Sequence, residues 1–124
     1  DDIVRFIAPE PGERLIEIGP GLGALTKKLL PFGPLTVIEI EEEFCRTLRE
    51  QHPDLEIVHA DVTTLDLSRF GERFTLVGNL PYSRSTDIVT HVLDHGARVK
   101  RGVFLLQKEF AERVAAPPGK RDYG

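Results

Sequence analysis

Residues 14–30, RLIEIGPGLGALTKKLL, decide the fold. Residues 14–18 are a short apolar run typical of a buried strand, and residues 22–30 carry apolar side chains at helical spacing. Gly19 and Gly21 lie between them, and glycine permits positive φ and a close approach of a ligand to the main chain. A strand, a glycine turn and a helix predict the first unit of an α/β sheet, although a purely structural tight turn would have the same pattern.

The rest of the chain repeats this alternation. Further strands are expected at residues 35–40, 55–59, 74–78 and 102–106. Helices are expected at residues 3–7, 41–51, 85–94 and 107–115. Ser85 or Thr86 would cap the 85–94 helix, and the polar connection 60–73 has room for a short helical turn. The pattern predicts a mostly parallel sheet with helices on both faces and a ligand site at the carboxyl ends of its strands.

The composition is that of one globular domain. The chain has 124 residues, of which 40% are hydrophobic, and this excludes two ordinary domains and compositional disorder. The net charge of −4 is uneven, because residues 1–62 carry 6 Lys/Arg and 13 Asp/Glu (net −7) while residues 63–124 carry 10 and 7 (net +3). A nucleic-acid backbone would therefore approach the second half.

Cysteine content and hydropathy bear on location. The only cysteine, Cys45, excludes an intramolecular disulfide and a cysteine metal cluster, and we expect a reducing, cytoplasmic setting. No apolar run approaches the roughly 18 residues of a membrane span. The chain begins without Met and stops soon after the fifth expected strand, so we expect a truncated protein.

Acidic residues end or follow three of the expected strands. Glu17 precedes the glycine turn, where an anionic side chain suits a ligand that bears positive charge. Glu39 ends the second strand about 20 residues later, a position from which a carboxylate accepts hydrogen bonds from both hydroxyls of a ribose. Asp61 follows the third strand and could accept from the exocyclic amine of adenine while Val62 touches the ring, although Asp61 alone also suits a turn or cap. Together these residues predict an adenosine pocket without a phosphate clamp.

The most specific signal is Asn79-Leu80-Pro81-Tyr82, directly after the fourth strand. The Asn79 side-chain oxygen can accept from an amine, and Pro81 has no N–H, so the Leu80 carbonyl can accept as well. Two acceptors would draw on the two hydrogens of a planar amino group and leave its lone pair free to attack an electrophile. Tyr82 offers a flat face on which a base could stack. An ordinary Asn-Pro turn before a helix is the alternative.

These motifs resemble the ribosomal RNA adenine N6-dimethyltransferase family of class I S-adenosylmethionine-dependent methyltransferases. The resemblance covers nearly the whole chain, with residues 17–26 similar to the cofactor motif and residues 38–44 and 59–67 similar to the second and third motifs. Residues 78–86 resemble the catalytic motif, and residues 105–124 a stretch typical of the small-subunit enzymes.

The resemblance implies a fold, an activity and a set of site residues. The fold is a Rossmann-like class I methyltransferase sheet that lacks the last strands and the C-terminal helical domain, and residues 1–124 would be a partial catalytic domain. The activity is methyl transfer from S-adenosylmethionine to N6 of adenine in small-subunit ribosomal RNA, as a dimethylation, with no metal. The implied catalytic residues are Asn79, Leu80, Pro81 and Tyr82. The implied cofactor-binding residues are Glu17, Gly19, Gly21, Glu39, Ile40, Asp61, Val62 and Asn79.

The same resemblance implies partners and shows departures. We expect the partner to be ribosomal RNA or a small-subunit precursor, no membrane, and a monomeric full-length protein. A basic face for the RNA could include Arg98, Lys100, Arg101, Lys108 and Arg113. Ser83 and Arg84 stand where the family usually has Asn and an aliphatic residue, so contacts to the target base should differ.

Three other functions fit parts of the pattern. An erythromycin-resistance type of 23S RNA adenine methyltransferase is the nearest, because residues 85–89 and the neighbourhood of Cys45 look somewhat like that group. A non-catalytic RNA-binding or transcription-factor relative would keep the fold, although the intact residues 79–82 weigh against lost catalysis. A nicotinamide dehydrogenase is disfavoured because its glycine pattern needs glycine where this chain has Ala24.

Overall fold

The computed structural model describes residues 2–10, 12–71, 73–96 and 99–107. The strands are β1 Leu15–Ile18, β2 Leu35–Glu39, β3 Glu56–His59, β4 Phe74–Pro81 and β5 Val99–Gln107. The helices are α1 Asp2–Ile7, α2 Ala24–Leu29, α3 Glu42–Gln51 and α4 Tyr82–Leu93. Short 3-10 turns lie at η1 Leu30–Phe32, η2 Val62–Thr64 and η3 Leu67–Phe70.

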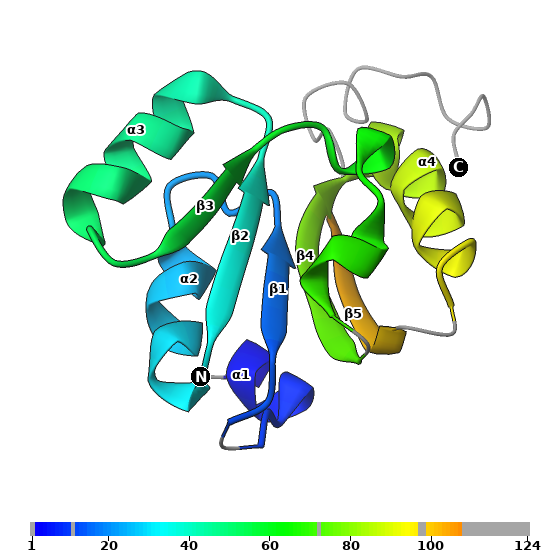
Figure 1. Cartoon of the computed structure of the whole chain (residues 1–124), viewed down its shortest axis with the longest axis horizontal. Helices are drawn as coiled ribbons and strands as arrows, with labels where there is room; N and C mark the ends of the chain where they lie inside the picture. The colour runs from blue at the N-terminus through cyan, green and yellow to red at the C-terminus, as the bar shows by residue number, and fades with distance from the viewer. Residues whose placement is uncertain (1, 11, 72, 97–98, 108–124) are drawn as a thin grey trace, which may run out of the picture.

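The five strands form one parallel sheet in the order β3-β2-β1-β4-β5 (Figure 1). The order reverses beside β1, so the chain builds outward first on one side and then on the other. In the register of the sheet, Ile18 at the end of β1 is opposite Ile38 on β2 and Gly78 on β4. The carboxyl ends of β1, β2 and β4 therefore meet at one edge, where a ligand site of this architecture is expected.

Apolar side chains pack on both faces of the sheet, as predicted. On one face, Ile16, Ile38 and Leu76 pack with the buried residues of η2, η3 and α4. On the other face, Leu15 and Val37 pack with Ile7 of α1, Leu29 of α2 and Leu48 of α3. Helices on both faces bury every side chain of β1 and β2 and leave only their carboxyl ends to face a ligand. No helix among the described residues combines the length and the apolar character that crossing a membrane requires.

Two boundaries around residue 80 differ from the sequence prediction. β4 continues to Pro81 instead of ending at residue 78, because Asn79, Leu80 and Pro81 pair with β5. α4 then begins at Tyr82, directly after Pro81, so Ser85 lies inside the helix and neither it nor Thr86 is the cap. The alternative of an ordinary Asn-Pro turn at residues 79–82 is thus wrong, because a strand end is joined directly to a helix there. The helix expected at 107–115 falls almost wholly outside the described residues.

Candidate functional site

An open cavity of about 290 Å³ lies at the carboxyl ends of the central strands. Its lining includes most of the predicted site residues, which come from four loops that are distant in sequence: Gly19, Gly21, Glu39, Ile40, Asp61, Val62, Asn79, Leu80 and Pro81. The volume is close to the lower end of the range for small-molecule sites. The glycine turn, the ends of β2 and β3 and the end of β4 therefore form one site.

Glu39 is held rigidly at the end of β2. Its side chain is buried, with 4% of the residue exposed. Its Oε1 accepts from the Gly21 N–H at 3.0 Å, and its Oε2 accepts from the Glu41 N–H at 2.9 Å. Each carboxylate oxygen has about two acceptor positions, so each keeps one for a further donor such as a ribose hydroxyl. The glycine turn and the acidic residue 18 positions later are thus joined by a direct hydrogen bond.

The glycine turn needs glycine for its backbone conformation. Gly19 and Gly21 have φ angles of 69° and 57°, in the left-handed region that side-chain-bearing residues rarely adopt. A Cβ at Gly19 would point at the Asn79 backbone oxygen, 3.9 Å away. The turn therefore brings bare main chain to the cavity, beside the end of β4.

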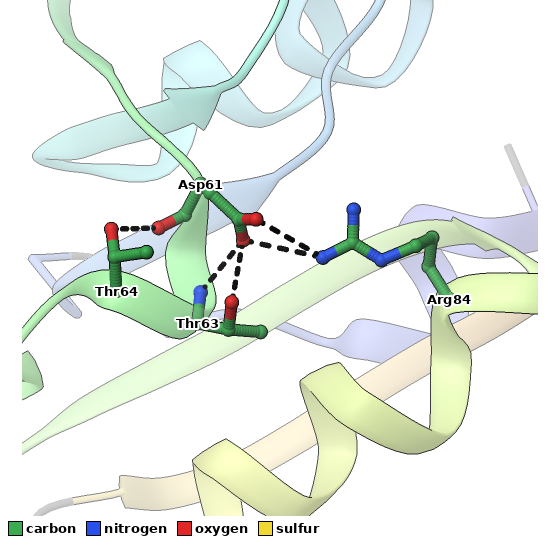
Figure 2. Close-up of polar contacts among 4 residues, drawn as sticks. All are labelled: Asp61, Thr63, Thr64 and Arg84. Atoms are coloured by element: carbon green, nitrogen blue, oxygen red, sulfur yellow. Dashed lines mark hydrogen bonds and ion pairs between the residues drawn. The ribbon is translucent and has the colours of Figure 1, made fainter.

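Asp61 caps the turn that follows β3 and also contacts α4 (Figure 2). Its Oδ1 accepts from the Thr63 N–H at 3.0 Å and from the Thr63 hydroxyl at 2.8 Å. The Arg84 Nη2 lies 3.3 Å from both Oδ1 and Oδ2. The Thr63 N–H and hydroxyl, with a smaller contribution from the Arg84 guanidinium, hold the pKa of Asp61 below its ordinary value, so this carboxylate is charged at neutral pH.

Asp61 has a structural role and also a place in the cavity. It is a cap, as its position alone suggested, and it also lines the cavity. Oδ1 is saturated by the cap, whereas Oδ2 accepts only from Arg84 among the described residues. The free acceptor position on Oδ2 is the one that an adenine amine could use.

Residues 79–81 reach the cavity from the end of β4. Asn79 is half-buried, and the Leu80 residue is 1% exposed. Pro81 immediately precedes α4 in an extended conformation, with φ −61° and ψ 140°. The Tyr82 side chain lies outside the described part of the structure.

Glu17 does not line this cavity in the part of the chain that the structure describes. It is 1% exposed, and its Oε1 accepts from the Thr26 hydroxyl of α2 at 2.6 Å. Burial, opposed by the Thr26 hydrogen bond and reinforced by the charge of Glu39, raises its pKa to about 7. The structure places Glu17 beneath the glycine turn, and its role in cofactor binding stays a prediction.

Sequence reasoning missed seven residues that line the cavity: Ile18, Ile38, Glu41, Phe44, Ala60, Arg84 and Ile88. Phe44 and Ile88 had the helical spacing of core residues, so nothing in the pattern marked them as ligand contacts. Ile40, which was predicted, is 48% exposed and lies at the cavity, where an apolar side chain could cover a flat ring. Arg84 had one signal, its departure from the family motif, but its contact with Asp61 spans 23 residues of sequence.

The two predicted basic-face residues that the structure describes, Lys100 and Arg101, do not line the cavity. Lys100 and Arg101 are near the start of β5, whereas the cavity lies at the carboxyl ends of the strands. Lys100 pairs with Glu13 at 4.0 Å, and Arg101 donates to the carbonyl of Ile7. These two cations therefore tie β5 to the N-terminal segment. Arg98, Lys108 and Arg113 lie outside the described residues.

Comparison with known proteins identifies the family of the chain. A family model described as "Ribosomal RNA adenine dimethylase" matches residues 1–124. The chain belongs to this family. It is 43% identical to the ribosomal RNA small subunit methyltransferase A of Verminephrobacter eiseniae, over 100% of this chain and 48% of that protein. The chain thus spans about half the length of the curated relatives that it matches.

Solved structures of the same kind share the fold. The 23S rRNA methyltransferase ErmE is 31% identical with a TM-score of 0.75, over 90% of this chain and 46% of ErmE. A dimethyladenosine transferase from Plasmodium falciparum is 30% identical with a TM-score of 0.68, over 94% of this chain and 44% of that one. The Rossmann-like methyltransferase fold predicted from the sequence is confirmed.

Proposed function

We propose that the protein containing this chain transfers methyl groups from S-adenosylmethionine to N6 of adenine in small-subunit ribosomal RNA. One observation carries the proposal. The carboxyl ends of β2, β3 and β4 bring Glu39, Asp61 and Asn79 to a single cavity, so acceptors suited to an adenosine and an acceptor suited to a target amine face the same space.

The described residues fit the adenosine part of S-adenosylmethionine. Glu39 keeps one acceptor position on each oxygen for the two ribose hydroxyls, because backbone N–H groups fill the others. Asp61 Oδ2 would accept from the adenine amine, and the exposed Ile40 would cover the ring. Gly19 and Gly21 would let the rest of the molecule lie against the main chain.

S-adenosylmethionine would supply an electrophilic methyl group on a sulfonium centre. The Asn79 side-chain oxygen and the Leu80 carbonyl would accept hydrogen bonds from the two N–H groups of the target amine. These bonds would orient the lone pair of the amine toward the cavity. No strong general base is required, since the neutral amine attacks before it loses a proton. Catalysis would rest mainly on positioning, and the target adenine must be unpaired or flipped out to reach Asn79.

The test is a methyl-transfer assay with labelled S-adenosylmethionine and unmethylated small-subunit ribosomal RNA, on the natural protein in which this chain occurs. N6-methylated adenosine should be the labelled nucleoside. Asn79→Ala should lower the transfer rate by at least about 100-fold, the scale of removing one preorganised polar group from an active site. Its affinity for S-adenosylhomocysteine should change by less than about threefold, or about 0.7 kcal/mol. An active Asn79→Ala protein would overturn the proposal.

A second candidate substrate is 23S ribosomal RNA, because ErmE gives the TM-score of 0.75. Parallel assays on separated small- and large-subunit RNA distinguish the two. Labelling of small-subunit RNA alone supports the proposal, and labelling of 23S RNA alone assigns the protein to the other substrate.

A further inference from the structure

The negative charge of the cavity lining opposes the approach of an RNA substrate. Three carboxylates line it, from Glu39, Glu41 and Asp61, and such a surface repels a polyanion. Among the described lining residues Arg84 is the single cation. An adenosine that reaches Asn79 must bring its flanking phosphates to the cavity mouth, so a compensating cation is required there.

Arg84 is positioned to supply that compensation. It lies in the first turn of α4, three residues after Pro81, and its side chain crosses the cavity to Asp61 (Figure 2). The side chain is 39% exposed, so one side of the guanidinium is accessible to solvent. Thr63 fixes Asp61 through two hydrogen bonds, and Asp61 in turn holds the guanidinium in place.

The ion pair leaves most of the guanidinium's donors available. Both contacts to Asp61 come from Nη2, at 3.3 Å, which is longer than an ideal charge-assisted hydrogen bond. In the described part of the chain Nε and Nη1 make no hydrogen bond, and together they carry three N–H groups. Nε and Nη1 point to different sides of the planar guanidinium, so either can donate to a phosphate oxygen while Nη2 stays on Asp61.

We propose that Arg84 binds a backbone phosphate beside the target adenosine, with Asp61 as the residue that positions its guanidinium. The inference rests on the proposed function and adds a substrate contact to it. The contact would lie directly beside the residues proposed for catalysis, three residues after Pro81. It would also join the two halves of the site, because Asp61 then serves both the cofactor and, through Arg84, the RNA.

The experiment compares Arg84→Gln and Arg84→Lys with Arg69→Gln, whose arginine is exposed on η3 and lies over the Phe70 ring instead of in the cavity. Binding of an unmethylated small-subunit ribosomal RNA transcript is measured over a range of KCl concentrations, with saturating S-adenosylhomocysteine. Cofactor affinity is measured separately by calorimetry, and circular dichroism confirms folding.

Arg84→Gln should weaken RNA binding by roughly 5- to 20-fold and reduce the slope of log K against log salt by about 0.7 to 0.9, the value for one lost phosphate contact. Arg84→Lys should keep the slope, because it keeps the charge. Arg69→Gln should bind RNA like the wild type, and cofactor affinity should change by less than about threefold in all variants.

Two results would overturn the inference. An unchanged salt slope in Arg84→Gln would mean that Arg84 contacts no phosphate. Weaker cofactor binding with unchanged RNA binding would mean that Arg84 holds the carboxylate of the cofactor instead. In either case the proposed function still holds if the wild-type protein binds cofactor and methylates RNA. A folded wild-type protein that does neither would overturn the proposed function and the inference about Arg84.

Discussion

Glu17 on β1 and Glu39 on β2 are buried carboxylates on neighbouring parallel strands, but different groups surround them. Glu17 of β1 is opposite Val37 of β2 in the register of the sheet, and Glu39 lies two residues after Val37 on β2. Because side chains alternate along a strand, both glutamates point to the same face of the sheet. Glu17 lies under α2 against Thr26, whereas Glu39 has passed the end of that cover and lines the cavity.

The difference shows how a small step along a strand changes what a carboxylate does. Glu39 receives two backbone N–H donors at the cavity. Glu17 receives a single hydroxyl donor, and burial raises its pKa to about 7. This geometry favours Glu39 as a ligand contact and Glu17 as a residue that packs against α2. The resemblance implies instead that Glu17 also binds the cofactor, and substitutions at the two positions separate these predictions.

The largest effect is expected from Glu39→Gln on cofactor binding. The new amide nitrogen would face the N–H of Gly21 or of Glu41, and one ribose acceptor would be lost. We expect the dissociation constant of S-adenosylhomocysteine to rise by more than about tenfold, or about 1.4 kcal/mol. The matched variant Glu17→Gln keeps an oxygen for Thr26, and we expect it to change this dissociation constant by less than about threefold. Equal losses in calorimetric titrations of the two variants would remove the distinction.

A smaller effect is expected from Glu17→Gln on stability, and it depends on pH. The folded pKa of about 7 is above the ordinary glutamate pKa of 4.5, so between these pH values the folded state holds a proton that the unfolded state has released. The unfolding free energy of the wild type should therefore fall as pH rises between these two values. Glu17→Gln should remove that fall and be more stable than the wild type at pH 8, by on the order of 1–3 kcal/mol.

Thr26→Val is the opposite control for this pH dependence. It removes the hydroxyl that donates to Glu17 at 2.6 Å, so the ionised carboxylate loses its hydrogen bond. Denaturant unfolding at pH 5 and pH 8 should show a larger loss of stability at pH 8. A wild-type unfolding free energy that is the same at pH 5 and pH 8 would show that the pKa of Glu17 is not raised.

The strands and the glycine turn could be predicted from the sequence because their signals are local. An apolar run such as residues 14–18 followed by glycines shows its structure within a few residues. The end of β4 could not be predicted, because Asn79, Leu80 and Pro81 pair with residues of β5 that lie 26 positions later in the sequence. Local turn chemistry pointed to a loop, and sheet pairing overrode it.

The same limit applies to the site. Gly19, Glu39, Asp61 and Asn79 were placed together correctly, because residues at the carboxyl ends of neighbouring parallel strands share one edge of the sheet. The contacts of Lys100 and Arg101 with Glu13 and the Ile7 carbonyl could not be predicted, since the charge of a side chain does not identify its partner. The contact of Arg84 with Asp61 needs the direction of a long side chain, which the sequence does not contain.

The most direct test of the account is a calorimetric titration with S-adenosylmethionine of the wild type, Asp61→Asn and Asp66→Asn. Both variants keep an oxygen for their caps, on Thr63 and Ser68, but Asp66 is exposed on another turn and lies outside the cavity. We predict binding by the wild type and Asp66→Asn, and binding at least about fivefold weaker in Asp61→Asn, or about 1 kcal/mol. Equal affinity in all three folded proteins, or no binding by the folded wild type, would contradict the account.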